Sequence, residues 1–138
     1  MNVFIVDDSS IVCSGLETML TELQDVHVIG KAATARDAIA AIEQLKPDVA
    51  ILDIRLLEGN GIEVLQRVKG KENAPTIIML TNYPYPQYKK KCMDLGADYF
   101  FDKVTEIETV GEIFREMLKK DEHERSGKEK ISADATES

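Results

Sequence analysis

The sequence is poor in cysteine, in long hydrophobic runs and in positive charge. Its two cysteines, Cys13 and Cys92, lie in helix-like segments without a CxxC motif or a nearby histidine, which favours reduced thiols. No hydrophobic run approaches the ~20 residues that span a bilayer, and the N-terminus enters a strand rather than a signal peptide. We therefore expect a cytoplasmic protein without membrane contact. The net charge of −8 disfavours direct binding to nucleic acid, which needs a basic surface.

The sequence does contain an alternation of strand-like and helix-like patterns. Its 138 residues, 43% of them hydrophobic, suit one domain with a real core. Short apolar runs predict five buried strands, at residues 3–7, 26–30, 49–53, 75–81 and 98–103. Apolar residues at three- and four-residue spacing predict a helix after each strand. Ser9 or Ser10 can cap the first helix, and Thr34 with Asp37 resembles a capping box for the second.

Five successive strand–helix units predict an α/β fold. Right-handed crossovers give a parallel sheet with helices on both faces. The flavodoxin-like strand order 2-1-3-4-5 places the first and third strands side by side. We expect one domain over residues 1–120, with residues 121–138 extending the last helix and fraying into a polar tail.

Acidic residues stand at two strand ends of this sheet. Asp53 closes the third strand, and Asp7 and Asp8 follow the first. Because the carboxyl ends of parallel strands share one edge, three carboxylates are expected to meet there. Taken alone, Asp7 and Asp8 could simply cap a helix, and Thr81 and Lys103 could be ordinary strand-end and solvated residues. The combination is what indicates a site.

With Thr81 after the fourth strand and Lys103 after the fifth, residues 2 to about 120 resemble a response-regulator receiver domain of CheY-like fold. Gly61, eight residues past Asp53, also fits, and the first three strands are similar to those of NarL/FixJ-type regulators. The resemblance implies a signalling protein of a two-component phosphorelay. Such a receiver is not an enzyme beyond catalysing its own aspartyl phosphorylation and dephosphorylation.

The resemblance also implies roles for the acidic residues. Asp53 would be the nucleophile that takes a phosphoryl group from a sensor histidine kinase or a phosphotransfer protein. Asp7, Asp8, the Asp53 carboxylate and the backbone carbonyl of Arg55 would hold Mg²⁺. This chemistry is sensible in itself, because phosphoryl transfer to an anion needs positioning and charge neutralisation more than covalent help.

Three further residues take roles in the same comparison. Thr81 would hydrogen-bond the phosphoryl oxygens, and Lys103 would pair with them. Phe100, three residues before Lys103, matches the aromatic that turns inward when Thr81 moves. Since phenylalanine turns inward without burying a hydroxyl, we predict that the unphosphorylated protein already populates part of the active conformation. The signal would pass to an unknown output protein through the fourth helix, fifth strand and fifth helix, and phosphorylation-dependent homodimerisation there remains open.

The sequence departs from the family pattern after Lys103. Val104 stands where the family usually has proline after a cis bond, and a non-proline cis bond costs ~3 kcal/mol, so we expect a trans bond. Arg55 and Tyr83 lie two residues after Asp53 and Thr81, at positions that flank the path of hydrolytic water in the family. Two large side chains there predict slow self-dephosphorylation.

Three alternative functions share part of this pattern. A pseudo-receiver would act as a scaffold without phosphorylation. An aspartate-nucleophile phosphatase of the haloacid dehalogenase type would need a second aspartate where this chain has Arg55, and usually carries its nucleophile on the first strand. A flavin or nucleotide binder would need backbone amides to cradle phosphate after the first strand, where Asp7 and Asp8 would repel it.

Overall fold

The computed structural model describes the backbone of residues 1–137 and the side chains of residues 1–124. Strands and helices alternate along this part of the chain. They are β1 (Asn2–Val6), α1 (Ser10–Thr21), β2 (His27–Ala32), α2 (Ala35–Leu45), β3 (Val49–Leu52), α3 (Gly61–Lys69), β4 (Thr76–Thr81), α4 (Pro86–Asp94), β5 (Tyr99–Asp102) and α5 (Ile107–Glu137).

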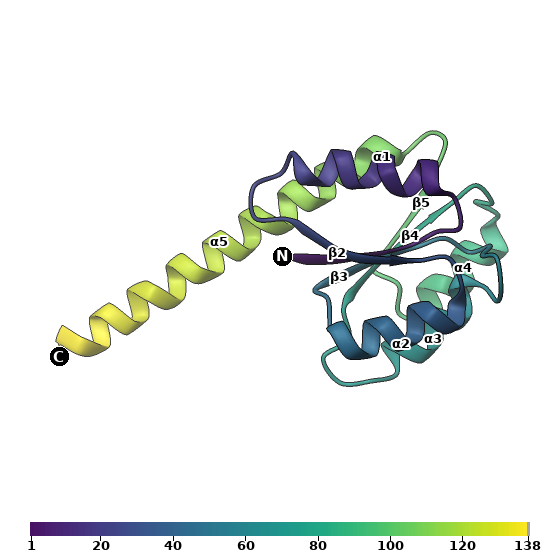
Figure 1. Cartoon of the computed structure of the whole chain (residues 1–138). Helices are drawn as coiled ribbons and strands as arrows, with labels where there is room; N and C mark the ends of the chain where they lie inside the picture. Colours follow the sequence, from purple (N-terminus) through teal and green to yellow (C-terminus); the bar gives the residue numbers. More distant parts are fainter. Residues whose placement is uncertain (138) are drawn as a thin grey trace.

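The strands form one parallel sheet in the order β2-β1-β3-β4-β5. Helices α1 and α5 cover one face of the sheet, and α2, α3 and α4 cover the other (Figure 1). This confirms the predicted flavodoxin-like, CheY-like architecture. The order makes β1 and β3 neighbours, with Val6 opposite Leu52, so the residues that follow both strands start from the same edge.

The core consists of two layers, one on each face of the sheet. Side chains alternate along β1: Val3 and Ile5 pack toward α1 and α5, whereas Phe4 and Val6 pack toward α2, α3 and α4. Because β1, β3 and β4 are covered on both faces, these central strands are apolar over most of their length. This is why they were recognisable as short continuous runs.

Three helices begin with a side-chain cap near the carboxyl edge of the sheet. The Ser9 hydroxyl accepts from Val12 N–H at 3.3 Å, and the Thr34 hydroxyl accepts from Asp37 N–H at 3.2 Å. Both caps were predicted. The cap of α3 was not: the Asn60 side-chain oxygen accepts from Glu63 N–H at 2.9 Å. Each cap satisfies a free N–H of a first helical turn and so holds a strand–helix loop in place.

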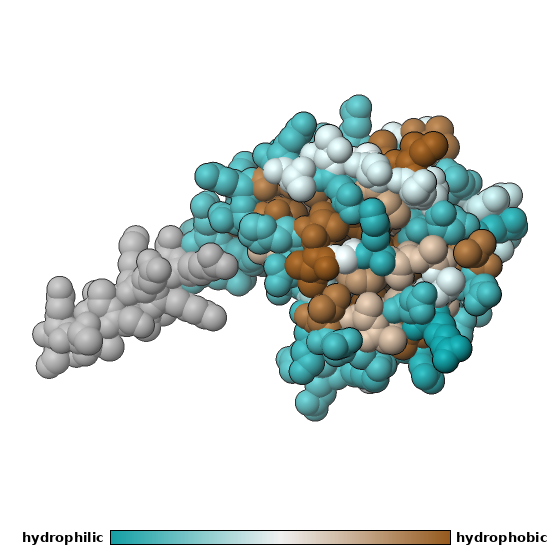
Figure 2. Space-filling model, viewed as in Figure 1, coloured by the Kyte–Doolittle hydropathy of each residue, from teal (hydrophilic) through white to brown (hydrophobic). Residues whose placement is uncertain are grey.

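Most strand ends differ from the sequence prediction by a single residue, and two element boundaries differ for reasons that the structure explains. Strand β2 runs to Ala32 rather than residue 30, because β1 stays paired with it after an irregularity at Val3 and Phe4. Helix α4 begins at Pro86, inside the predicted loop, since proline is well suited to the first helical position. Figure 2 shows hydrophobic side chains gathered in a band between α1 and α2, over the edge strand β2.

Helix α5 is continuous from Ile107 to Glu137 and runs away from the sheet (Figure 1). Met117 and Leu118 still pack against the core layer beneath α1 and α5, and Lys119 and Lys120 are exposed. The predicted boundary at residue 120 remains a prediction, and the side chains of the predicted polar tail beyond residue 124 lie outside the described residues. Within the described part of the chain, no helix combines the length and hydropathy needed to cross a membrane.

Candidate functional site

Two aspartates are held at the carboxyl edge by the backbone ladder of the sheet. Asp53 N–H donates to Val6 O at 2.9 Å, and Asp7 N–H donates to Ala32 O at 3.0 Å. The ladder therefore continues one residue beyond β1 and β3. Asp7 and Asp53 are thereby fixed at the point where the neighbouring strands end.

The three predicted acidic residues meet at this edge. Carboxylate oxygens of Asp7, Asp8 and Asp53 all lie within 4.8 Å of one another. Asp7 and Asp53 are 5% and 6% exposed, whereas Asp8 is open to solvent. A cavity of about 250 Å³ opens beside Asp7 and Asp8 and is also lined by Cys13, but Asp53 does not line it. Like charges this close repel strongly in a partly buried site, so the arrangement needs a cation.

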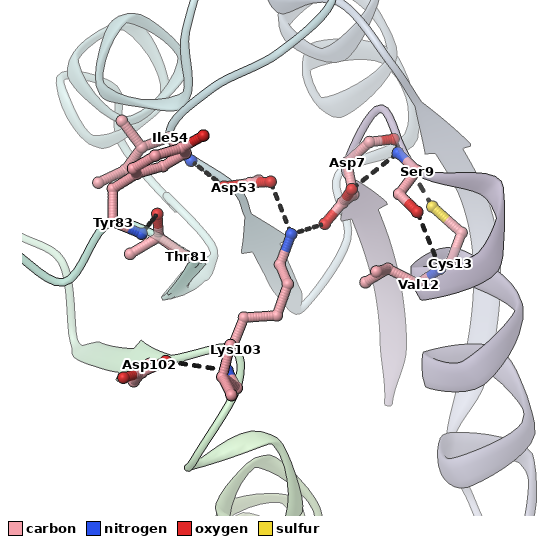
Figure 3. A network of polar contacts seen from close by, with 11 residues as sticks. Asp7, Ser9, Val12, Cys13, Asp53, Ile54, Thr81, Tyr83, Asp102 and Lys103 are labelled. Carbon is pink, nitrogen blue, oxygen red and sulfur yellow. Dashed lines mark hydrogen bonds and ion pairs between the residues drawn. The ribbon is translucent and has the colours of Figure 1, made fainter.

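Lys103 supplies one positive charge. Its ammonium lies 2.6 Å from Asp7 Oδ2 and 2.7 Å from Asp53 Oδ2, between the two carboxylates (Figure 3). The Lys103 side chain is 7% exposed, and its backbone N–H donates to Thr81 O at 2.8 Å. No cis peptide bond occurs among the described residues, so Lys103–Val104 is trans, as predicted.

Burial and ion pairing have opposing effects on the pKa values of Asp53 and Lys103. Burial raises the pKa of Asp53, and the hydrogen bond from Lys103 opposes that rise without cancelling it. Burial alone would lower the pKa of Lys103, but hydrogen bonds to Asp53 and Asp7 together outweigh it and raise the pKa. The lysine therefore stays protonated at neutral pH. Three carboxylates against one ammonium leave the site with excess negative charge.

Backbone donors fix the orientation of the two buried carboxylates. Ile54 N–H donates to Asp53 Oδ1 at 2.7 Å, and Ser9 N–H donates to Asp7 Oδ1 at 2.8 Å (Figure 3). The Cys13 thiol donates to Asp7 O at 3.6 Å, and burial raises the pKa of this thiol. The Ile54 and Ser9 donors carry no sequence signal, because any non-proline residue supplies a backbone N–H.

The oxygen ligands of this edge suit a hard divalent cation. Carboxylate and carbonyl oxygens favour Mg²⁺, Ca²⁺ or Mn²⁺, whereas thiolate or imidazole ligands would favour softer metals. Mg²⁺ keeps several waters, so a few carboxylates beside an open cavity are sufficient. The residues present therefore fit the predicted metal.

Three other predicted residues lie on the far side of Asp53 from Asp7. Thr81 is fully buried, and its hydroxyl accepts from Tyr83 N–H at 3.0 Å. The guanidinium carbon of Arg55 lies 4.0 Å from the centroid of the Tyr83 ring. The two residues predicted to flank the water path are therefore in contact with each other.

Phe100 is the predicted site residue that does not join the polar group. It is buried, at 9% exposed, and belongs to the core layer under α4 together with Cys92 and Ala97. Its role as a switch stays a prediction.

Gly61 has a structural role that sequence reasoning did not provide. A Cβ atom at this position would lie 1.8 Å from Asp53 O, closer than any real contact. Gly61 N–H donates to Ile54 O at 2.7 Å, which closes the loop that follows Asp53. The first residue of α3 thus abuts the backbone of the central aspartate, and only glycine fits there.

Comparison with known proteins agrees with this geometry. Residues 3–115 match the model of the family described as the response regulator receiver domain. The chain is 29% identical over 115 residues to the response regulator protein VraR of Staphylococcus saprophyticus, covering 83% of this chain and 55% of VraR. VraR of Staphylococcus aureus is 27% identical over the same length. The chain thus spans about half the length of these curated relatives.

Solved structures show the same likeness. The response regulator domain of Thermotoga maritima CheB superimposes with a TM-score of 0.76 at 25% identity, over 87% of this chain and 94% of that one. The signal receiver domain of NarL from Mycobacterium tuberculosis gives a TM-score of 0.70 at 26% identity, over 74% and 82% of the two chains. Fold, strand-end residues and family match agree: the chain belongs to the response regulator receiver domains of two-component systems, with a likeness to NarL-type receivers.

Proposed function

We propose that this receiver accepts a phosphoryl group on Asp53, with Mg²⁺, from a sensor histidine kinase or a phosphotransfer protein. The observation that carries the proposal is the Lys103 ammonium seated between Asp7 and Asp53, beside a third carboxylate at an open edge. An aspartate that attacks phosphorus brings two anions together, and Lys103 with a Mg²⁺ held by the carboxylates would offset their repulsion.

Each residue of the group has a distinct part in that reaction. Asp7, Asp8, the Asp53 carboxylate and the Arg55 carbonyl would hold Mg²⁺, which when bound supplies positive charge for the phosphoryl oxygens. An Asp53 carboxylate oxygen forms the new bond to phosphorus as the phosphorus–nitrogen bond of the donor phosphohistidine breaks. Ile54 N–H keeps the other carboxylate oxygen oriented during the attack.

Two side-chain groups remain to bind the transferred phosphoryl group: the Lys103 ammonium and the Thr81 hydroxyl. Lys103 shares its ammonium between two carboxylates, so it can turn toward a phosphoryl oxygen without leaving Asp7. As a compact point charge it needs no particular geometry. Thr81 stands at the neighbouring strand end and would donate its hydroxyl to another phosphoryl oxygen.

The donor is proposed to be a protein because the site has an exposed apolar rim. Ile11, Leu57 and Val104 are 83%, 73% and 75% exposed, and they follow Asp8, Asp53 and Lys103 closely in the chain. Exposed hydrophobic groups around a polar centre are typical of protein contact surfaces. The output surface is proposed to be α4, β5 and α5, where Tyr85 is also exposed.

Acetyl phosphate tests the proposed function directly. We expect a Mg²⁺-dependent gain of one phosphoryl group by intact mass, absent from Asp53→Asn, because Asp53 is the proposed nucleophile, with its carboxylate oriented by Ile54 N–H and paired with Lys103. Asp25→Asn is the matched control, since Asp25 is exposed in a left-handed turn that asparagine tolerates. Labelling that persists in Asp53→Asn would refute the assignment. Absence of labelling in every protein would favour the scaffold alternative.

Metal binding has its own thermal signature. Saturating Mg²⁺ should raise Tm by several degrees, because a ligand at a hundredfold excess over Kd stabilises the folded state by ~2.7 kcal/mol. Asp8→Asn should lose most of this shift while becoming more stable without metal, since one of the repelling carboxylates is gone. Calorimetry with and without Mg²⁺ measures both effects, with Asp25→Asn as control. An unchanged Mg²⁺ shift in Asp8→Asn would exclude Asp8 as a ligand.

The phosphorylated protein should lose its phosphoryl group slowly. Arg55 and Tyr83 are two large side chains in contact with each other beside Asp53, and their bulk hinders an attacking water. Tyr83→Ala should shorten the phosphoryl lifetime about tenfold, a difference of ~1.4 kcal/mol in the barrier. Intact mass followed over time gives the rate, and Tyr88→Ala, which removes a ring farther along α4, should leave it unchanged. Equal lifetimes in all three proteins would contradict the prediction.

A further inference from the structure

Arg55 carries a positive charge that has no acidic partner among the described side chains. Its side chain is exposed, and every ion pair among the described side chains uses a lysine instead. Two residues earlier, Asp53 belongs to a group of three carboxylates with only Lys103 to balance them. A free guanidinium therefore stands next to a site with excess negative charge.

The Tyr83 ring holds this guanidinium. The guanidinium carbon lies 4.0 Å from the ring centroid, which is a cation–π contact. Tyr83 is itself tied to the site, because its N–H donates to the Thr81 hydroxyl at 3.0 Å. Figure 3 shows Tyr83 and Thr81 beside Asp53, on the side away from Asp7.

Tyr83 also begins a row of aromatic rings that leads away from the site. Its centroid lies 6.3 Å from that of Tyr85, and the Tyr85 and Tyr88 centroids are 5.6 Å apart, with the planes tilted by 44° and 47°. These distances lie within the range of favourable aromatic pairs. We call Tyr83, Tyr85 and Tyr88 the tyrosine row. It joins the site to the start of α4.

The backbone under Arg55 is fixed, whereas its side chain is free to turn. Arg55 forms an isolated bridge with Asn60, and Gly61 N–H donates to Ile54 O at 2.7 Å, so the loop after Asp53 is closed. The exposed side chain has no hydrogen bond among those of the described residues, and the ring contact alone defines its position. A change of charge at Asp53 would therefore move the guanidinium and leave its backbone in place.

We propose that Arg55 binds the phosphoryl group on Asp53, and that Tyr83 holds the guanidinium in reserve until that group arrives. The inference rests on the proposed function. A phosphoryl group adds about −1.5 to −2 charge, and the planar guanidinium can donate two hydrogen bonds to it at once. At an exposed position this pairing is much stronger than a cation–π contact. Arg55 then leaves Tyr83, no covalent bond changes, and the tyrosine row repacks.

The assignment separates Arg55 from Lys103 in function. Lys103 is buried and approaches Asp53 from the side of Asp7, whereas Arg55 is exposed and approaches from the side of Tyr83. Lys103 serves the attack on phosphorus. Arg55 binds the phosphoryl group after its transfer to Asp53. Its departure from Tyr83 then changes the packing of the tyrosine row at the start of α4.

Near-ultraviolet circular dichroism can follow the tyrosine row, because the chain has no tryptophan and only four tyrosines. In a Tyr99→Phe background the whole tyrosine band comes from the row. We expect the phosphoryl mimic trifluoroberyllate, with Mg²⁺, to change this band. Adding Arg55→Gln should produce the mimic-bound band without the mimic, abolish any further change, and weaken trifluoroberyllate binding about tenfold. Arg115→Gln, an exposed arginine on α5, is the matched control and should keep the full change.

Fluorine NMR of bound trifluoroberyllate and intact mass after acetyl phosphate treatment show independently whether the site works. A bound signal with an unchanged tyrosine band, or with the same band change in Arg55→Gln, overturns the inference and leaves the proposed function standing. If the Tyr99→Phe protein shows neither a bound fluorine signal nor a mass gain, the inference and the proposed function are both overturned. Loss of binding in Arg55→Gln, with binding kept in Arg115→Gln, supports direct contact of Arg55 with the mimic.

Discussion

The Lys103→Met variant is expected to lose about 3 kcal/mol of unfolding free energy at neutral pH without Mg²⁺. Methionine keeps the length and most of the packing of the side chain but removes the ammonium between Asp7 and Asp53. Both carboxylates are almost fully buried and would face each other without a counter-charge. A loss of this size is a large part of the 5–15 kcal/mol that stabilises an ordinary domain.

The loss should depend on pH in a definite direction. Lys103 lowers the pKa of Asp53, so its removal lets burial raise that pKa further above the value of 3.8 in an unfolded chain. A folded carboxyl with a raised pKa binds a proton that the unfolded chain releases, so stability falls as pH rises through the interval between the two values. The variant should therefore approach the wild type near pH 4 and fall behind it as pH increases.

Urea denaturation at several pH values measures this difference. The double variant Lys103→Met/Asp53→Asn is the informative control, because it removes one of the two unpaired charges and should recover part of the lost stability. Saturating Mg²⁺ should also recover part of it. A Lys103→Met protein as stable as the wild type at every pH would show that solvent already screens the two carboxylates.

The Gly61→Ala variant is expected to lose about 3 kcal/mol as well, through a steric effect rather than charge. An alanine Cβ would lie 1.8 Å from Asp53 O and 2.8 Å from the Asp53 carbonyl carbon. Both are backbone atoms next to a buried strand, so no side-chain rotation relieves the contact. The start of α3 must move away, which breaks the 2.7 Å hydrogen bond from Gly61 N–H to Ile54 O.

Movement of this loop should also impair the site, since Ile54 N–H orients the Asp53 carboxylate. Gly61→Ala should therefore show both a lower urea midpoint and slower labelling by acetyl phosphate. Gly15→Ala is the matched control: Gly15 lies within α1 with no atom near its Cβ position, and the change should stabilise the protein by about 0.5–1 kcal/mol. Equal stability of the two variants would mean that the β3–α3 loop yields easily.

The fold was predictable because its information is local. A strand covered on both faces is apolar along its length, as Val49–Leu52 is, and the helices show their buried stripe at three- and four-residue spacing. The handedness of crossovers then leaves few topologies. The same logic places Asp7 and Asp53 at one edge, and the structure finds them there with Asp8.

Boundaries and loops were less predictable, because neighbours in space decide them. β2 extends to Ala32 because β1 continues to pair with it. Helix α4 starts at Pro86, although the local sequence around this proline is typical of a turn. The Asn60 cap of α3 follows the same rule as Ser9 and Thr34. The glycines on either side of Asn60 make this segment resemble a turn and hide the cap in the sequence.

By itself, the sequence determined the parallel five-stranded fold and the residue types that stand at its carboxyl edge. The tertiary structure alone decided how those residues meet. Lys103 reaches Asp7 and Asp53 from 96 and 50 residues away. Gly61 abuts the backbone of Asp53, and Arg55 rests on Tyr83. The hydrophobic periodicity of the sequence indicates on which face of a helix or strand a residue lies. Contacts between residues far apart in the chain depend on the assembled sheet, where distances of a few ångströms decide charge pairing and steric fit.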